Sequence, residues 1–254
     1  MDLFIYPNII SEKYIKKVKE SIAVLESKGY NCFLDEQDSN IIYGDSRYNS
    51  KKINDCDLLV TLGGDGAFLR GVKLAIDNNK NICGINCGHL GYLCTYNFEE
   101  LQDVDFEKLH IKEYPLLKFT DNQNNNIFAL NDIVIGKDYF GGTIKLRVKL
   151  NDKILYDFIG DGLIISSAIG STAYNYSARG KILDKNTKQM VITPICPYTK
   201  DIESIVVYEN DVIEIESLKE IYHSSIYNDG MYFAPFIKGK VIYSDKLIKI
   251  LDKY

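Results

Sequence analysis

Hydrophobic and polar positions change their period along the chain, and the first part combines two patterns. A continuous apolar run over residues 58–62 predicts a strand buried on both faces, whereas apolar residues three or four positions apart predict a helix over residues 11–29. A polar stretch over residues 37–49 predicts a loop. The order of elements predicts a parallel sheet with helices on both sides, with further strands over residues 3–6, 31–34 and 82–85 and a helix over residues 67–76.

After about residue 97 the pattern becomes that of an antiparallel sheet. Residues 143–150 alternate apolar and charged side chains, which predicts a strand with one wet face. The Asn-Asp-Gly sequence at residues 228–230 predicts a hairpin turn. We therefore expect an α/β domain over residues 1–97 and a mostly antiparallel β domain over residues 98–244, followed by a closing helix over residues 245–254 that packs back on the first domain. Further short strands are predicted over residues 154–159, 163–167, 190–193, 205–208 and 212–216.

Composition narrows the classes of partner. The 254 residues carry a net charge of −5, and no basic stripe indicates a nucleic-acid groove. Neither a signal peptide nor an apolar run long enough to cross a bilayer is expected, so we predict a cytoplasmic protein with no membrane partner. The six cysteines form no Cys-x-x-Cys pair and are expected to be buried free thiols of a reducing compartment. The histidines at positions 89, 110 and 223 are too dispersed for a histidine metal centre.

The glycine-rich segment directly after the buried strand carries the first chemical signal. Gly63, Gly64 and Gly66 surround Asp65, and a predicted helix follows. Glycines let a phosphate approach the main chain, and the start of a helix offers unpaired N–H groups and the positive end of a dipole. The spacing matches neither Gly-x-Gly-x-x-Gly nor the Walker A motif, so a hydride-transfer dehydrogenase is a poor fit.

Asp65 has two interpretations on local grounds, because a carboxylate among phosphates is electrostatically unfavourable. It could cap the following helix. It could instead accept a proton from an attacking hydroxyl, or help to hold a metal. The residues of the loop alone do not decide between the two.

Three further polar clusters lie next to predicted strands or apolar runs. The segment 86–92 places two glycines around His89, Asn131 and Asp132 precede an apolar run, and Gly160-Asp161-Gly162 precedes the hydroxyl-rich segment 170–177. Asn131 and Asp132 together could grip ribose hydroxyls, and Tyr174 could stack on a base. Taken singly, each cluster is explained better as an ordinary turn, bulge or helix cap.

Taken together and in this order, the clusters resemble the ATP-dependent NAD kinase family. The resemblance extends over residues 58–245 and includes Tyr-Pro-Leu-Leu at 114–117 and Thr-Pro-Ile-Cys-Pro at 193–197. It implies a Rossmann-like parallel-sheet N-terminal domain, a C-terminal antiparallel β-sandwich, and an active site in the crevice between them. It also implies transfer of the γ-phosphoryl group of ATP to the adenosine 2′-hydroxyl of NAD.

The resemblance implies a role for each residue of the clusters. Asp65 would be the catalytic base, and Gly63, Gly64 and Gly66 would hold the ATP phosphates. Mg²⁺ or another divalent cation would accompany ATP, with no protein side chain predicted as a direct ligand, and the family suggests a homodimer or homotetramer. The residues implied to bind NAD are Asp65, Gly66, Tyr92, Asn131, Asp132, Asp161, Thr172, Ala173, Tyr174 and Ser177.

Several positions depart from the family pattern. Asp132 stands where the family has Glu, which keeps the charge but shortens the side chain by one methylene. Ile169 lacks the usual hydroxyl before the 170–177 segment, and Arg179 replaces a typical glycine. The end of the chain lacks the aromatic-basic tail with a late histidine. None of these changes removes the proposed base.

Two alternatives belong to other classes. Lipid kinases of the diacylglycerol type share the glycine loop, but their pattern has Gly-Thr-x-Asn-Asp after the next strand. This chain has Gly-His-Leu-Gly-Tyr at 88–92 instead. The chain also shows no amphipathic membrane-binding stretch. A non-catalytic NAD(P)-binding regulatory protein would keep the pocket without turnover, and the intact Asp65 argues against it.

Overall fold

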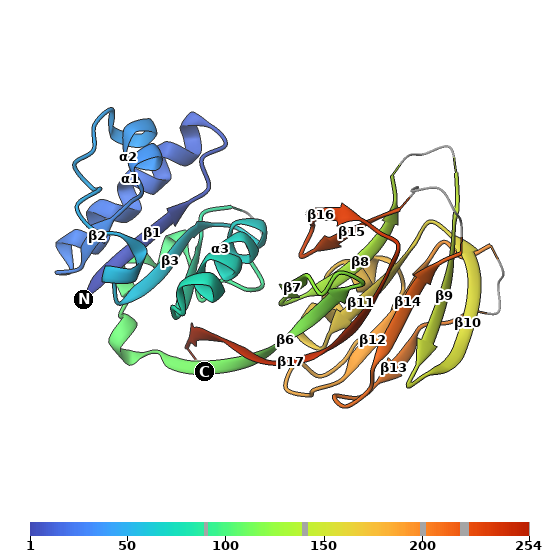
Figure 1. Ribbon diagram of the computed structural model, residues 1–254. Helices are drawn as coiled ribbons and strands as arrows, with labels where there is room; N and C mark the ends of the chain where they lie inside the picture. The colour runs from blue at the N-terminus through green and yellow to red at the C-terminus, as the bar shows by residue number, and fades with distance from the viewer. Residues whose placement is uncertain (89–90, 139–141, 199–201, 219–223, 254) are drawn as a thin grey trace. The chain divides into compact units, whose positions relative to one another are not determined.

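The computed structural model describes residues 1–88, 91–138, 142–198, 202–218 and 224–253, and it divides into two compact units (Figure 1). The first unit comprises Met1–Tyr114 and the segment from Ile248 onward, and the second comprises Pro115–Leu247. The first unit extends past residue 97, where the following turns bury Leu101 and Phe106 in its core.

A parallel sheet with the strand order β4-β3-β1-β2 forms the first unit. Short apolar strands alternate with amphipathic helices, as the two hydrophobic periods predict. The elements are β1 (Asp2–Pro7), α1 (Glu12–Ser27), β2 (Asn31–Phe33), α2 (Glu36–Tyr43), β3 (Leu58–Gly63), α3 (Asp65–Asn78), β4 (Ile82–Asn86) and β5 (Tyr96–Asn97), with 3₁₀ helices at Ile53–Asp55, Phe98–Asp103 and Phe106–Lys108.

Helices α1 and α3 cover opposite faces of this sheet. Side chains of α1 join one core with Leu58, Val60 and Leu62 of β3. The intervening Thr61 faces α3, where a Cβ added to Gly71 would lie 2.4 Å from its Cγ2. Every residue of β3 is buried, as its continuous apolar run predicts. This arrangement brings the carboxyl ends of β3 and β4 to the same edge, with Gly63 paired to Asn86.

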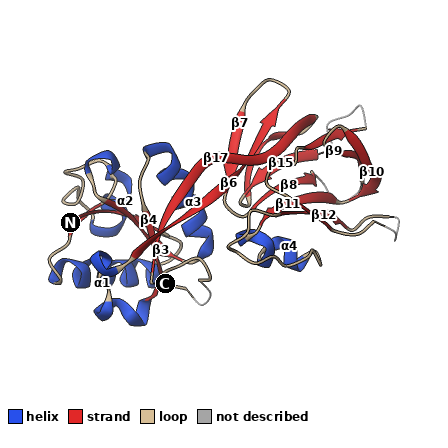
Figure 2. Ribbon diagram, turned by 90° about the horizontal axis from the view of Figure 1, so that it is seen from below, coloured by secondary structure: helices blue, strands red, loops and turns tan. Residues whose placement is uncertain are grey.

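The second unit is an antiparallel β-sandwich, and Figure 2 shows that its one α-helix among the described residues is the short α4. One sheet has the order β13-β12-β11-β8-β15-β16, and the other contains β10-β9-β14-β17 with β6 and β7. Inward side chains of both sheets share a single core. The elements are β7 (Asn126–Ala129), β8 (Asp132–Lys137), β9 (Ile144–Leu150), β10 (Lys153–Gly160), β11 (Gly162–Ser167), a 3₁₀ helix at Ile169–Thr172, α4 (Tyr174–Ser177), β12 (Met190–Ile195), β13 (Ile205–Val207), β14 (Ile213–Ser217), β15 (Ser224–Asn228) and β16 (Met231–Pro235).

Strands β6 (His110–Asp121) and β17 (Lys238–Asp252) have residues in both units and pair with each other. The predicted helix over residues 245–254 is therefore wrong within the described residues, since β17 continues through Asp252. Its end pairs in parallel with β4 through Ile250 and Ile82. The predicted fold class is confirmed: a parallel α/β unit and an antiparallel β-sandwich.

The loop predicted over residues 37–49 is also wrong, because its first half lies in α2. The Asp35 side chain accepts a hydrogen bond from the Asp38 N–H at 2.7 Å, and Gly44 ends the helix in the left-handed region at φ 77°. Cys196 is exposed, contrary to the expectation of buried thiols, although all six cysteines are free. Within the described ranges, no helix is both long enough and apolar enough to cross a membrane.

Candidate active site

The glycine-rich segment occupies the turn from β3 into α3. Gly63 ends the strand, Gly64 is the residue before the helix, and Asp65 is the first helical residue. A Cβ added to Gly63 would lie 2.6 Å from Ala67 Cβ and 2.9 Å from Asn8 Cβ, so this position has no room for a side chain. The first N–H groups of α3 have no acceptor within the helix, and Gly66 is exposed. The turn can therefore receive an anion.

Asp65 does not cap its own helix, so the capping interpretation is wrong. Its carboxylate accepts hydrogen bonds from the backbone N–H groups of Tyr92 at 3.1 Å and Leu93 at 2.9 Å. Both donors belong to the loop that follows β4. The carboxylate is half-buried and lies beside the glycine turn, where its position suits proton transfer to and from a bound hydroxyl.

The loop after β4 is held by Asn86. The Asn86 side chain accepts a hydrogen bond from the Gly88 N–H at 2.9 Å and donates to Asn97 Oδ1 at 3.3 Å. A Cβ added to Gly91 would lie 2.6 to 2.8 Å from atoms of the Asn86 side chain, so the glycine is sterically required. The predicted motif also included His89 and Leu90, which lie outside the described residues.

Sequence reasoning missed two polar residues beside the glycine turn. Arg70 donates from Nη2 to Asn8 Oδ1 at 3.0 Å, and its Nη1 would lie 3.7 Å from a Cβ on Gly66. The signal was present, because Arg70 follows Gly66 by four positions on a helix and so shares its face. Tyr92, predicted to line the NAD site, belongs to the same unit and is 84% exposed.

The second unit contains a hollow of about 390 Å³, which we call the β8 hollow. It brings together three of the predicted residues, Asp132, Asp161 and Tyr174. Asp132 begins β8, Asp161 precedes β11, and Tyr174 begins α4, so three elements supply polar or aromatic groups. The remaining lining residues are Val134, Gly136, Lys137, Ile195, Tyr227 and Gly230.

Asn131 is buried directly before β8, and its Oδ1 has no hydrogen-bond partner among the described residues. Its backbone carbonyl accepts from the Ser167 N–H at 2.8 Å and from Ser166 Oγ at 3.3 Å. Gly170 packs against this backbone so closely that an added Cβ would lie 2.2 Å from the Asn131 oxygen. The backbone is fixed, and a buried oxygen remains ready to accept a donor.

Two carboxyl groups are enclosed next to this residue. Burial, together with the nearby charge of Asp229, raises the pKa of Asp132 to about 7. Burial also raises the pKa of Asp229 to about 6, although hydrogen bonds from the N–H groups of residues 130–132 oppose the rise. Asp229 was predicted only as part of a hairpin turn, so its contacts with the Asn131 segment were missed.

Asp161 is in an ion pair that the sequence did not suggest. Lys137 Nζ lies 2.7 Å from Asp161 Oδ1, and the Lys137 N–H donates to the Asp161 carbonyl at 3.0 Å. Both residues line the β8 hollow. Lys137 therefore places a positive charge in the lining of the hollow, beside Asp161, which is predicted to bind the dinucleotide.

The segment 169–177 carries the remaining predicted residues. Tyr174 lines the β8 hollow, whereas Thr172, Ala173 and Ser177 lie along the same segment outside its lining. Arg179, the departure from a typical glycine, adopts the left-handed backbone at φ 62°, which explains why glycine suits this position.

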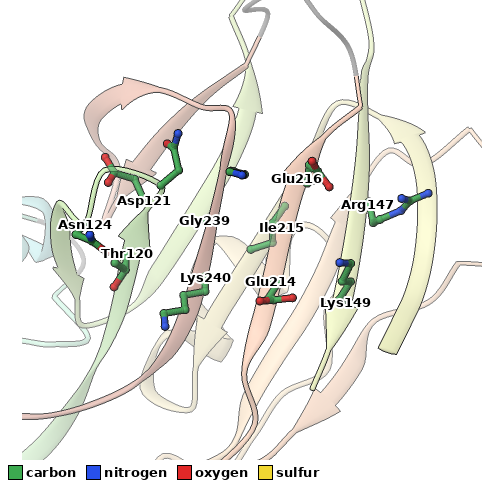
Figure 3. Close-up of a pocket in the computed structure, with 12 residues that line it drawn as sticks. Thr120, Asp121, Asn124, Arg147, Lys149, Glu214, Ile215, Glu216, Gly239 and Lys240 are labelled. Carbon is green, nitrogen blue, oxygen red and sulfur yellow. The ribbon is translucent and has the colours of Figure 1, made fainter. Parts of the chain in front are cut away.

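A different hollow of about 340 Å³ lies on the outer face of the β9-β14-β17 sheet and contains none of the predicted residues (Figure 3). Its glutamates stand between cations on the neighbouring strands, as expected of a solvated sheet face. Glu214 is opposite Lys149 and Lys240, and Glu216 is opposite Arg147 and Lys238.

Comparisons with known proteins identify the family. The model of the ATP-NAD kinase N-terminal domain matches residues 9–110, and that of the ATP-NAD kinase C-terminal domain matches residues 130–242. The NAD kinase of Caldanaerobacter subterraneus is 33% identical over 95% of this chain and 89% of that protein. The NAD kinase of Clostridium beijerinckii is 33% identical over 82% of this chain and 72% of that protein.

Solved structures agree on the fold. Yeast NADH kinase complexed with NADH superimposes with a TM-score of 0.84 at 21% identity, covering 100% of this chain and 84% of that one. An NAD kinase from Archaeoglobus fulgidus in complex with ATP gives a TM-score of 0.78 at 20% identity, covering 100% of this chain and 94% of that one. With both family models and relatives of one-third identity along most of its length, the chain belongs to the NAD kinase family and is a phosphotransferase.

Proposed function

We propose that this chain phosphorylates the adenosine 2′-hydroxyl of NAD with ATP, giving NADP and ADP. Asp65 accepts the hydroxyl proton while the 2′-oxygen forms its bond to the γ-phosphorus, and the bond from that phosphorus to the β–γ bridging oxygen breaks. The observation that carries the proposal is the pair of backbone N–H bonds to Asp65 from Tyr92 and Leu93. These bonds orient the carboxylate.

The ATP phosphates are assigned to the glycine turn. Gly63, Gly64 and Gly66 let the phosphates approach the N–H groups at the start of α3. Arg70 adds a positive charge beside Gly66. No group of three or more acidic, histidine or cysteine side chains that could hold a metal gathers in the described part of the chain. Following the family resemblance, Mg²⁺ or another divalent cation would accompany ATP, and it would spread the charge that develops during transfer.

The dinucleotide is assigned to residues of the second unit. The unpartnered Oδ1 of Asn131 and the carboxylate of Asp132 accept hydrogen bonds from ribose hydroxyls. Tyr174 offers an aromatic face for a base, and Thr172, Ala173 and Ser177 supply neighbouring contacts on the same segment. Asp161 takes the nicotinamide side, and the family resemblance assigns Tyr92 and Gly66 of the first unit to the same ligand.

We also propose a cytoplasmic homodimer or homotetramer. The family resemblance supports the oligomer, and six free cysteines fit a reducing compartment. Size-exclusion chromatography with light scattering would measure the state directly, and a monomer at working concentration would contradict this part of the proposal.

Transfer of labelled phosphate from ATP tests the function. The wild-type protein is expected to label NAD and not diacylglycerol in vesicles. Asp65→Asn is expected to lower kcat by about 10²–10⁴-fold, because it removes the general base. Asp77→Asn is the matched control, since Asp77 is an exposed residue near the other end of α3.

Each alternative gives a distinct result. Labelled phosphatidic acid would indicate the lipid kinase, and calorimetric NAD binding without any NADP would indicate the regulatory protein. An Asp65→Asn variant that keeps wild-type kcat would remove Asp65 from the mechanism while leaving the family assignment intact.

A further inference from the structure

The turn between β15 and β16 makes more contacts than a hairpin needs. A two-residue hairpin turn requires only residues that tolerate positive φ, and Asp229 at 48° and Gly230 at 77° satisfy that requirement. The Asp229 side chain is not needed for the turn itself. It nevertheless reaches a segment almost one hundred positions earlier in the chain.

The Asp229 carboxylate accepts hydrogen bonds from three consecutive backbone N–H groups. Oδ2 accepts from Leu130 at 2.8 Å, and Oδ1 accepts from Asn131 at 2.7 Å and Asp132 at 3.2 Å. In return, the Asp229 N–H donates to the Asp132 carbonyl at 3.0 Å. An ionised carboxylate makes stronger hydrogen bonds than a neutral acceptor, so this clamp is firm.

The clamped segment is held from its other side as well. The Ser167 hydroxyl donates to the Leu130 carbonyl at 2.6 Å, and the Ser167 N–H donates to the Asn131 carbonyl at 2.8 Å. With N–H groups bonded to the hairpin and carbonyls bonded to the end of β11, the segment has little freedom to rotate. The side chains of Asn131 and Asp132 therefore leave a fixed backbone.

The arrangement also carries an electrostatic cost. Asp229 places a second carboxyl beside Asp132, and like charges in an enclosed site repel each other. An asparagine would serve a hairpin turn equally well without that repulsion. The carboxylate is explained if its task is to accept three N–H groups, since an amide oxygen with an adjacent NH₂ group does not accept all three.

We propose that Asp229 is a positioning residue for the dinucleotide, acting through the backbone of residues 130–132 to aim the Asn131 and Asp132 side chains. The inference rests on the proposed function, because it takes NAD as their ligand. Interactions that are equal in the ground state and the transition state appear in KM. Asp229 therefore governs the KM for NAD and leaves the KM for ATP unchanged.

The test compares Asp229→Asn with Asp121→Asn. Asparagine is accepted at positive φ, so the turn is kept. Asp121 is a matched control, because its carboxylate also accepts backbone N–H groups within a turn of the second unit, from Gln123 and Asn125 at 2.8 Å. The KM for NAD of D229N is expected to rise about tenfold or more. This is the cost of losing one or two hydrogen bonds between NAD and the Asn131 and Asp132 side chains. The KM for ATP should stay within about twofold in both variants, as expected for uniform NAD binding.

A double-mutant cycle with Asn131→Ala separates positioning from a general structural role. If Asp229 acts through Asn131, the two changes are less than additive in the KM for NAD. Additive effects, or a fall in kcat with both KM values unchanged, would overturn the proposal. Should D229N not fold, Asp229→Gly relaxes the positive φ and repeats the comparison, and loss of folding in both variants would show a structural residue and overturn the positioning role.

Failure of the proposed function has a different signature. A wild-type protein that forms no NADP would defeat the function, whereas calorimetric titration with NAD would still compare wild-type with D229N. If wild-type makes NADP and D229N binds NAD as tightly as wild-type, the function stands and the positioning role falls.

Discussion

At the scale of single residues, the orientation of Asp65 depends on a backbone segment 27 and 28 positions further along the chain. That segment keeps its path because Gly91 has no side chain, and the Asn86 side chain fills the space where a Cβ would stand. The orientation of the proposed base therefore depends on a residue that performs no chemistry.

Gly91→Ala is predicted to lower kcat by about 10-fold to 100-fold, because small displacements of a catalytic group are costly. The methyl group forces either Asn86 or the loop to move, and the N–H donors of Asp65 move with the loop. Steady-state kinetics on the purified variant measure the effect. Gly71→Ala crowds Thr61 and Ile82 at a position of α3 six residues beyond Asp65, so it should lower the Tm but leave kcat of the folded protein unchanged. Equal kcat in wild-type and Gly91→Ala would contradict the prediction.

The enclosed Asp132 predicts a pH dependence of stability. Its pKa is about 7 in the folded protein and near 3.8 when exposed, so between pH 4 and 7 the folded state retains a proton that the unfolded chain has released. The free energy of unfolding therefore falls as pH rises through this window. Asp132→Asn should remove part of that fall. The free energy of unfolding of the variant relative to wild-type should therefore be on the order of 1–4 kcal/mol higher at pH 8 than at pH 4. Urea unfolding at both pH values measures this, and parallel pH curves would refute it.

At the scale of elements, α4 is a helix of four residues that cannot be stable alone. Asn175 is fully buried and holds it in place. Its Nδ2 donates to the carbonyls of Ser171 at 2.8 Å and Lys181 at 3.0 Å, and its Oδ1 accepts from Thr193 Oγ1 at 2.6 Å. Tyr174, the neighbouring residue, owes its position in the β8 hollow to these bonds.

Asn175→Ala is therefore predicted to cost about 2–4 kcal/mol of stability, since it leaves the buried Ser171 carbonyl and Thr193 hydroxyl without these partners and removes the bond to Lys181. Chemical denaturation measures the loss. Thr193→Val removes a single bond of the network and should cost less, so a larger effect of Thr193→Val would contradict this account of α4.

Local patterns predicted most elements, and they failed where tertiary pairing decides. The continuous apolar run of β3 and the alternation of β9 appear as predicted. The end of β17 was predicted as a helix, and Leu247, Ile248 and Leu251 do have helical spacing. In the structure Ile248 and Ile250 are buried at the spacing of a strand, and pairing with β4 overrides the local preference.

Local patterns predicted one part of the site, and the other part depends on tertiary contacts. Asp132, Asp161 and Tyr174 come together around the β8 hollow, as expected of residues that follow or begin strands and helices. Lys137 and Asp229 were missed because their contacts are with residues 24 and about 98 positions away, which no local motif encodes.

At the scale of the whole molecule, each unit has its own hydrophobic core, and the first unit includes a segment from the far end of the described chain. That segment is bound firmly. Ile250 pairs with β4, Leu251 is buried in the first core, and its carbonyl accepts from Thr95 Oγ1 at 2.6 Å. Asp252 forms an ion pair with Lys112 at 2.9 Å, and Lys253 forms one with Glu100 at 2.7 Å.

Truncation after Leu247 is predicted to destabilise the first unit selectively. Hydrogen exchange followed by mass spectrometry should show faster exchange in β1, β3 and β4, with β8, β11 and β12 unchanged. Lys253→Ala is the control, since one partly exposed ion pair contributes about 1 kcal/mol or less. Uniform loss of protection in both units would show that they unfold together and contradict the prediction.

The path of β6 and β17 has a consequence for biosynthesis. The ribosome makes residues 248–253 only after all of the second unit, so the first unit cannot complete its sheet until its neighbour has been translated. The portion of the chain that begins folding first finishes last. During that interval the β4 edge at Ile82 lacks its partner strand, and an unpaired strand edge is the kind of nascent surface that chaperones shield from other chains.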